Sequence, residues 1–225
     1  MKATLQPVTA VQDIENQYRN FILNGQHPCI MAKSIFKMDK YQLKIYEDIY
    51  DVKSLKKLID DLDQYISNYN FEGKGFESFL AVFPNNYFDD EIGFEKSLWL
   101  TLQKLHELDH CEWDHSVSDD PDNPLFSFSL NGRAFYIIGM HPASSRMARR
   151  TPYTTLVFNL HCQFDKLRKI GTYQTVRDNI RKNDQLLQGS INPVLNDYGN
   201  DSETRQYSGR NVEDQWKCPF HKKHN

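Results

Sequence analysis

The sequence lacks the features that mark membrane, secreted and nucleic-acid-binding proteins. No window approaches the ~20 consecutive apolar residues that a membrane-spanning helix needs, and the N-terminus shows no apolar signal stretch. The formal net charge is only −3, from 27 basic and 30 acidic residues, which leaves no electrostatic footprint for nucleic acid. We therefore expect a cytoplasmic protein that binds neither membrane nor nucleic acid.

Motifs for several common cofactors are also missing. The four cysteines (Cys29, Cys111, Cys162 and Cys218) are too scattered for a CxxC zinc site, and a cytoplasmic location predicts that they are reduced. The chain shows no flavin or nicotinamide fingerprint, no internal repeat and no low-complexity linker. At 225 residues it is expected to form a single domain, residues 1–225, with a full core.

The periodicity of the apolar residues predicts an α+β fold. Helical spacing is found over residues 11–23, 53–69, 94–108 and 164–187, with an interruption near Gly171. Short apolar or alternating runs predict strands at residues 41–46, 79–83, 125–130, 134–140 and 155–159. Asn131-Gly132 between two of these runs is typical of a tight hairpin turn. Because helices and strands do not alternate regularly, we expect a largely antiparallel sheet with helices packed on it. The polar segment after Gly189 is expected to add little to the core.

The segment from His141 to Arg150 places polar side chains between two apolar runs. It contains Ser145 and three arginines, Arg146, Arg149 and Arg150. Buried polar groups are costly unless something satisfies them, and arginine suits a carboxylate or a phosphate. If the segment is helical, Arg146 and Arg150 are spaced i, i+4 and project from one face as a clamp for two carboxylates. The alternative is a set of surface charges on a helix.

Cys29 follows Pro28 and precedes a short apolar stretch that is expected to begin a helix. A thiol at a helix start gains from the helix dipole and the exposed amides, which favour the thiolate. The alternative is a buried structural cysteine. His141 and His161, which flank the arginine segment, are either strand-end histidines or partners in a pocket, including iron ligands.

Two further groups of residues have both a functional and a structural interpretation. His106 and His110 are spaced i, i+4 and could share a zinc ion, with Cys111 and His115 nearby, although no HExxH motif is present. The C-terminal residues Tyr207, Arg210 and Cys218 lie in a tail that either closes over a site or packs as a terminal arm.

Motifs spread over most of the chain resemble the YqcI/YcgG family. The match is densest after Leu125 and weakest over residues 53–91. Its motifs are Pro28-Cys29, His141-Pro142, Ser144-Ser145-Arg146, Ala148-Arg149-Arg150, Phe158-Asn159, His161, Gln163-Phe164, Leu167-Arg168, Ile180-Arg181, Asp184, Gln188-Gly189-Ser190, Asn192-Pro193, Gln206-Tyr207-Ser208-Gly209-Arg210 and Cys218-Pro219-Phe220. The resemblance implies a heme-dependent enzyme, because members of this family N-hydroxylate guanidines in D-cycloserine and guanitoxin biosynthesis.

This implied activity suggests roles for the candidate residues. We expect heme b with iron, a guanidine or amine substrate, O2 and an external electron donor. A thiolate ligand favours O–O cleavage more than a histidine does, so Cys29 is the expected iron ligand, ahead of His141 and Cys218. The arginine segment is expected to hold the heme propionates. The cofactor-binding residues are then Ser145, Arg146, Arg149, Arg150, Tyr207 and Arg210, and the catalytic or substrate-holding residues are Asn159, His161 and Gln163.

A cationic substrate would also need an acid, for which Asp114, Asp119, Asp120 and Glu203 are candidates. Two other functions stay open. One is a heme-binding protein without turnover, and the other is a zinc-dependent hydrolase built on His106 and His110.

Overall fold

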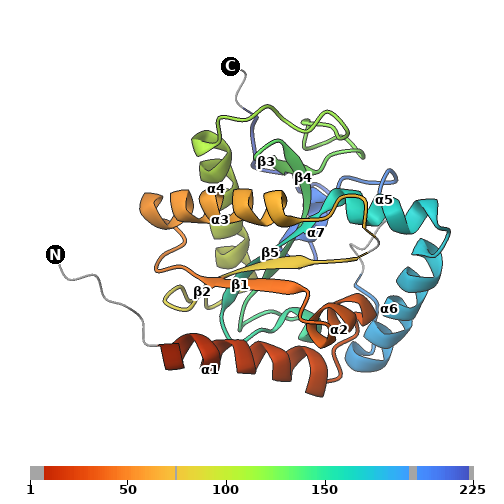
Figure 1. Cartoon of the computed structure of the whole chain (residues 1–225). Helices are drawn as coiled ribbons and strands as arrows, with labels where there is room; N and C mark the ends of the chain where they lie inside the picture. Colours follow the sequence, from red (N-terminus) through yellow and green to blue (C-terminus); the bar gives the residue numbers. More distant parts are fainter. Residues whose placement is uncertain (1–7, 74, 193–196, 223–225) are drawn as a thin grey trace.

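A five-stranded sheet, with spatial order β1-β2-β5-β4-β3, forms the centre of the molecule (Figure 1). The computed structural model describes residues 8–73, 75–192 and 197–222. The strands are β1 (Tyr41–Ile45), β2 (Ser78–Phe83), β3 (Phe128–Leu130), β4 (Arg133–Met140) and β5 (Thr154–Leu160). Each neighbouring pair is antiparallel except β1 and β2, which run parallel and are connected through α3 (Val52–Asn68). The expected α+β class with a largely antiparallel sheet is confirmed.

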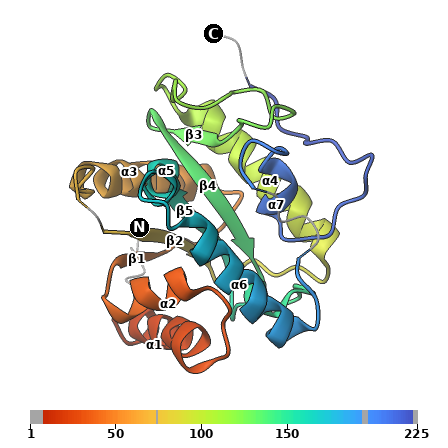
Figure 2. The same ribbon diagram turned by 90° about the vertical axis from the view of Figure 1, so that its right-hand side faces the viewer.

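Helices cover both faces of the sheet. On one face, α3 and α4 (Glu91–Leu108) enclose the larger apolar core. On the other face lie α1 (Val8–Arg19), the π-helical turn η1 (Asn20–Asn24) and α2 (Ile30–Lys37). The two helices after β5, α5 (His161–Lys169) and α6 (Tyr173–Gln188), run past the end of the sheet towards α2 (Figure 2). The short elements are η2 (Met147–Arg149), a 3-10 turn, and α7 (Thr204–Tyr207).

Local chemistry explains several of these boundaries. Asp51 and Asp90 are N-cap residues whose carboxylates accept hydrogen bonds from the backbone N–H of Ser54 (2.9 Å) and Gly93 (2.7 Å). The predicted hairpin is present between β3 and β4, and both of its central residues, Asn131 and Gly132, have positive φ. Residues 170–172 separate α5 from α6, with Gly171 at a φ of 72°, where the sequence predicts an interruption.

The expectation that the segment after Gly189 adds little to the core is wrong. Tyr207 and Phe220 are fully buried in the same apolar cluster as α3 and α4. The Phe220 ring lies about 6 Å from the rings of Trp113 (6.0 Å) and Phe128 (5.9 Å). Tyr207 and Phe220 stand at isolated positions in the sequence, so no apolar periodicity indicates that they are buried.

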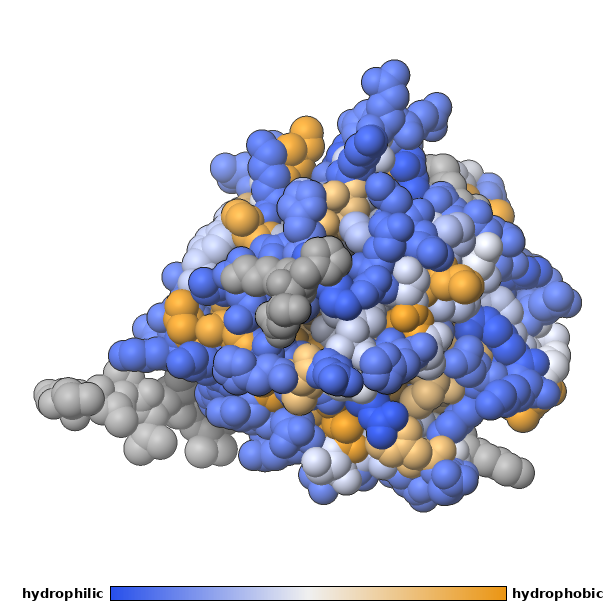
Figure 3. Space-filling model, turned by 90° about the horizontal axis from the view of Figure 1, so that it is seen from above, coloured by the Kyte–Doolittle hydropathy of each residue, from blue (hydrophilic) through white to orange (hydrophobic). Residues whose placement is uncertain are grey.

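The surface shows no large apolar area on the side that Figure 3 displays. This face is mainly hydrophilic, with its apolar residues scattered. Within the described ranges, no helix is long and apolar enough to span a bilayer.

Candidate functional site

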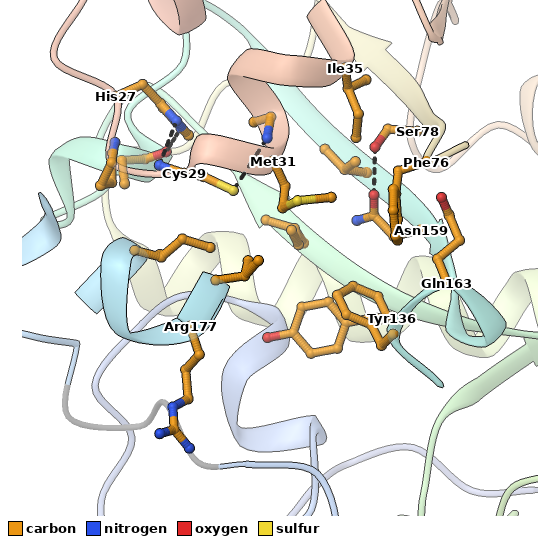
Figure 4. Close-up of a pocket in the computed structure, with 18 of the residues that line it drawn as sticks. His27, Cys29, Met31, Ile35, Phe76, Ser78, Tyr136, Asn159, Gln163 and Arg177 are labelled. Carbon is orange, nitrogen blue, oxygen red and sulfur yellow. Dashed lines mark hydrogen bonds between the residues drawn. The ribbon is translucent and has the colours of Figure 1, made fainter. Parts of the chain in front are cut away.

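A cavity of about 330 Å³ lies between the sheet face that carries α1 and α2 and the helices α5 and α6 (Figure 4). Its volume falls within the range of small-molecule sites. Strands β2, β4 and β5 form one wall, and residues 197–206 close another side. The lining includes many large apolar side chains: Ile22, Met31, Ile35, Phe36, Leu80, Ile138, Met140, Val157, Phe164, Leu167, Val176 and Ile180. A cavity of this composition suits a ligand with a large apolar surface.

Cys29 is the N-cap residue of α2, so the expected helix start is confirmed. Its sulfur accepts a hydrogen bond from the Ala32 N–H at 3.4 Å and lines the cavity (Figure 4). Burial raises the pKa of the Cys29 thiol, while the amide groups of Ala32 and Met31 act against this rise. The thiol is therefore neutral at pH 7 in the ligand-free protein, and a bound metal ion would deprotonate it.

His27 fixes the approach to this helix. Its Nδ1 accepts a hydrogen bond from the Cys29 N–H at 3.3 Å, which leaves Nε2 to donate to the Ala148 carbonyl oxygen at 3.2 Å. Burial lowers the pKa of His27 to about 4, so the ring is neutral in this position. The histidine thus ties the Cys29 turn to the connection between β4 and β5.

Three polar side chains from neighbouring strands face the cavity. Ser78 at the start of β2 donates from Oγ to Oδ1 of Asn159 at 2.6 Å, and Asn159 stands opposite Tyr136 in the β4–β5 register. The Tyr136 hydroxyl donates to Oε1 of Gln206 at 2.9 Å. Because Ser78 holds the amide oxygen of Asn159, the NH2 group of Asn159 is oriented as a donor for a ligand.

Arg146 joins the β4–β5 connection to the end of α6. Its guanidinium is buried, forms an ion pair with Asp184 and donates to the backbone oxygen of Ser190 at 2.9 Å. Asp184 also accepts from the Asn192 N–H at 3.1 Å. This pair satisfies both charges and anchors one end of the cavity wall.

Arg149 is a buried cation held by carbonyl groups. It donates to the backbone oxygens of Gly139 (3.1 Å), Tyr207 (2.9 Å) and Gln206 (2.9 Å). Among the described residues, no carboxylate lies within ion-pair distance of its guanidinium. Gly209, with a φ of 81°, allows the close approach, because a Cβ there would lie 2.8 Å from Cδ of Arg149. Arg149 therefore adds an uncompensated positive charge to the cavity wall.

Helix α6 covers the cavity with one face. The cavity-lining residues recur at helical spacing: Tyr173, Val176, Arg177, Ile180, Arg181 and Asp184. Of these, Asp184 is buried and the other five are partly exposed. Arg177 and Arg181 both pair with Asp197, the latter at 3.4 Å. Arg177 was not among the residues predicted from sequence, although its helical spacing from Tyr173 and Asp184 was a usable signal.

Glu203 lines the cavity as a buried acid. Its Oε2 accepts hydrogen bonds from the Ser127 hydroxyl at 3.0 Å and the Tyr207 hydroxyl at 3.2 Å. His161 lies behind it, with Nδ1 at 3.9 Å from Oε1 of Glu203 and at 3.2 Å from the Ser127 oxygen. Burial raises the pKa of Glu203 to about 8 and lowers that of His161. Of the four candidate acids, Glu203 lines this cavity, whereas Asp114, Asp119 and Asp120 do not.

The other two candidate iron ligands lie away from the cavity lining. His141 is fully buried and stacks on Phe94, with 4.3 Å between ring centroids. Within the described structure, neither of its ring nitrogens has a hydrogen-bond partner. Cys218 is buried in the core on the opposite face, where burial raises its pKa to about 12. Of the three, the structure places Cys29 at the cavity.

The expected clamp of Arg146 and Arg150 is wrong. The Arg149 N–H donates to the Arg146 oxygen at 2.9 Å, an i to i−3 contact, so the segment forms a 3-10 turn rather than an α-helix. Arg150 turns back to the Ser144 oxygen (2.9 Å), away from the cavity lining. Ser145 is also outside the lining and bonds to Glu91 at 2.8 Å.

Other predicted site residues have structural partners. Gln163 lines the cavity, but both ends of its amide bind the Glu77 backbone, at 2.7 and 2.9 Å. Tyr207 lies in the core, and its hydroxyl holds Glu203. Arg210 forms ion pairs with Glu95 and Glu213, both at 2.8 Å, outside the cavity lining. Tyr207 and Arg210 therefore support the site from behind.

The histidines of the zinc alternative are dispersed. Helix α4 ends at Leu108, so His110 lies beyond the helix that carries His106. His106 packs near Trp113 and His115 pairs at the surface with Glu112 at 3.4 Å. The described residues contain no group of three or more His, Cys, Asp or Glu side chains arranged for a metal ion.

Comparison with known proteins gives the family. The profile of the YqcI/YcgG family matches residues 18–221. The chain is also 26% identical over 214 residues to the uncharacterized protein YqcI of Bacillus subtilis (strain 168), covering 89% of this chain and 83% of that protein. No solved structure gives a significant match. The chain belongs to the YqcI/YcgG family.

Proposed function

From this family membership and the cavity at Cys29, we propose that the protein is a heme-dependent N-hydroxylase. It would bind heme b and hydroxylate a guanidine or amine nitrogen of an amino-acid-like substrate, with O2 and electrons from an external donor. The observation that carries the proposal is the Cys29 thiol, which stands at a helix start and faces a largely apolar cavity lined by five arginines. The activity is the one that the family resemblance implies.

The position of Cys29 fits a thiolate ligand to heme iron. The Ala32 N–H points at the sulfur, and such a hydrogen bond stabilises a thiolate and moderates its electron donation. Lys33 adds a further positive potential near the sulfur. When bound, heme would supply the oxidation of the substrate nitrogen, and a thiolate ligand favours that chemistry.

The charge of the cavity wall fits the two heme propionates. Five arginines line the cavity: Arg146, Arg149, Arg168, Arg177 and Arg181. The lining carboxyl groups are Glu77, Asp184, Asp197 and Glu203. Glu203 is largely protonated at pH 7 because of its raised pKa of about 8, so the wall carries an excess of positive charge. We propose that Arg177 and Arg181 hold the propionates, because Arg150 lies outside the lining and Arg149 is committed to backbone carbonyls.

The remaining polar groups suit orientation of the substrate. The amide NH2 of Asn159 donates into the cavity, and Tyr136 offers a ring and a hydroxyl beside it. The apolar residues exclude water around the reacting nitrogen. His161 acts one layer behind the lining, where it positions Glu203 through Ser127.

The test is an absorption spectrum of protein expressed with a heme supply, before and after addition of L-arginine. We expect a Soret band that shifts on titration, and a ferrous–CO band characteristic of thiolate ligation. Cys29→Ala should abolish the ferrous–CO band, whereas the matched variant Cys218→Ala should retain it. A Soret band that no guanidine or amine perturbs would favour a heme-binding protein without turnover. Absence of heme despite supply would reject the proposal.

A further inference from the structure

We infer that Glu203 forms a subsite for a flat organic cation, which it binds as a carboxylate at the aromatic end of the cavity. The inference assigns the residue that binds the cationic group of the proposed substrate, and it rests on the proposed function only for the chemistry that follows binding. Glu203 is 4% exposed and lines the cavity, so its carboxyl can meet a ligand without meeting bulk solvent.

The first observation is a missing cation. Among the described residues, three glutamate or aspartate side chains are buried, and two of them pair with an arginine. Asp184 pairs with Arg146, and Glu95 pairs with Arg210 at 2.8 Å. Among the described residues, Glu203 has no lysine or arginine within ion-pair distance: His161 lies at 3.9 Å, and Arg168 acts on the carboxylate only from farther away. Buried carboxylates are normally paired, so a ligand is the natural partner here.

The second observation is the set of donors on Glu203. The Ser127 and Tyr207 hydroxyls both reach Oε2, whereas the described residue nearest to Oε1 with which it can pair is His161 at 3.9 Å. Two hydroxyl donors stabilise a carboxylate but do not neutralise it. A guanidinium group that donates to Oε1 would complete the site.

The third observation is the aromatic surrounding. Tyr136, Phe164 and Tyr198 line the same end of the cavity, with the Tyr136 and Phe164 rings 5.5 Å apart. Cations bind favourably over such rings. Arg168 already shows this packing, since its guanidinium lies 4.9 Å from the rings of both Tyr173 and Tyr198. Asp165 neutralises Arg168 at 2.8 Å, so Arg168 does not neutralise Glu203.

Binding of a cation by Glu203 should release a proton. The pKa of Glu203 in the ligand-free protein is about 8, so the group is mostly protonated at pH 7. A bound cation stabilises the carboxylate and lowers that pKa. The other groups that face Glu203 are Asp165 and Arg168 on α5, His161, Tyr136, Tyr198 and Tyr207. Burial keeps His161 neutral by lowering its pKa, and it raises the pKa values of Tyr136, Tyr198 and Tyr207, so these four groups should not titrate between pH 7 and 8.

The experiment is calorimetry of L-arginine binding to the heme-loaded protein in two buffers of different ionisation enthalpy. At pH 7 we expect release of up to one proton per arginine, and an affinity that rises with pH and levels off once the pH exceeds the Glu203 pKa of about 8. L-Citrulline, which has the same shape without the cation, should bind without proton release. Glu203→Gln should abolish both the release and the pH dependence, whereas Glu213→Gln, at an exposed acid of the same segment, should leave them intact.

The outcomes separate this inference from the proposed function. Arginine binding with no proton release, or release that survives Glu203→Gln, overturns the subsite even if heme is bound. Release that depends on Glu203 in a protein that never takes up heme supports the subsite and rejects the N-hydroxylase. Absence of arginine binding to both heme-loaded and heme-free protein also overturns the subsite.

A second pair of variants covers a failure of Glu203→Gln to fold. Ser127→Ala and Tyr207→Phe each remove one hydroxyl that stabilises the carboxylate. Each should raise the pKa of Glu203 and move the midpoint of the pH dependence upward. An unmoved midpoint in both variants would contradict the assignment.

Discussion

The two faces of the central sheet differ in how completely they are filled. On the face covered by α3 and α4, strand residues such as Phe79, Ile137 and Phe158 are fully buried and touch other large apolar side chains. On the opposite face, Tyr136 and Ile138 of the same strands are only partly buried and border a cavity. The alternation of side chains along each strand therefore separates a closed core from an open site.

This difference divides stability and ligand binding between the faces. The closed face contains the dense packing that gives a domain most of its stability. The open face carries the groups that would be costly in such a core: the thiol of Cys29, the amide of Asn159 and the acid Glu203. We expect substitutions on the closed face to change the free energy of unfolding, and substitutions on the open face to change binding.

The largest effect is expected from a matched pair on β4. Ile137 and Ile138 are neighbours of the same residue type that point to opposite faces. Ile137→Ala should lower the free energy of unfolding by about 2–5 kcal/mol, because it leaves a cavity in a packed core. Ile138→Ala should cost clearly less, since its side chain already borders open space, and should change ligand affinity instead. Denaturant unfolding of both variants checks this, and equal losses would remove the distinction between the faces.

A smaller effect on stability is expected from adding a methyl group to the closed face. A Cβ at Gly139 would lie 2.5 Å from Leu98 Cδ1 and 2.8 Å from the Phe94 ring. Gly139→Ala should therefore destabilise the protein by about 1–3 kcal/mol through overpacking. Gly75 provides the control, because a Cβ there meets nothing within 4 Å. The midpoint of thermal unfolding is measured for Gly139→Ala and Gly75→Ala. An unchanged midpoint for Gly139→Ala would show that the closed face has room for the added methyl group.

The third prediction concerns His141, a polar residue enclosed on the closed face. Burial lowers its pKa to about 4, whereas an unfolded histidine titrates near ~6.5, so the unfolded chain binds the extra proton more readily. The stability contributed by the neutral ring is present above pH ~6.5 and is lost as the pH falls towards 4. His141→Leu should weaken this acid sensitivity and stabilise the protein at pH 7 by about 1 kcal/mol, because no described partner satisfies the ring nitrogens.

Unfolding free energies at pH 7 and pH 5 test the His141 prediction. An acid sensitivity equal in His141→Leu and the unmodified protein would contradict it. His27, whose pKa is also lowered, should still contribute to the change of the unfolding free energy with pH in both proteins.

The smallest effect on stability is expected from Arg177 on the open face. Its ion pairs with Asp178 and Asp197 lie near the surface, and such pairs contribute about 0–1 kcal/mol. Arg177→Gln should therefore unfold almost like the unmodified protein, and under the proposed function it should bind less heme. Arg205→Gln, outside the cavity lining, is the control. Unchanged heme occupancy in Arg177→Gln would remove this residue from the propionate site.

The sequence predicted features that arise from local chemistry. The Cys29 helix start, the Asn131-Gly132 hairpin and the break at Gly171 depend on neighbouring residues and are all present. The parallel pairing of β1 with β2 and the burial of Phe220 depend on contacts between distant segments, and no local pattern encodes them.

The same limit applies to the candidate site. Cys29, Arg146, Arg149 and Asn159 were singled out from sequence and do line one cavity. The spacing of Arg146 and Arg150 led to a wrong prediction of a clamp, because a pattern over five residues does not distinguish an α-helix from a 3-10 turn. The sequence could not predict that Glu203 has no arginine within ion-pair distance, because ion pairing depends on which residues are neighbours in three dimensions.

The three carbonyl contacts of Arg149 bear on how the protein acquires a ligand during biosynthesis. They join the end of β4 to Gln206 and Tyr207, and so bring the Glu203 segment to a cavity whose other wall carries Cys29. The ribosome synthesises Cys29 early and Glu203 late. During most of synthesis the nascent chain therefore contains the cavity wall with Cys29 but not the segment with Glu203. Insertion of the proposed heme is therefore expected to follow translation, and an arrested chain that stops before Gln206 should leave Cys29 without an enclosed cavity.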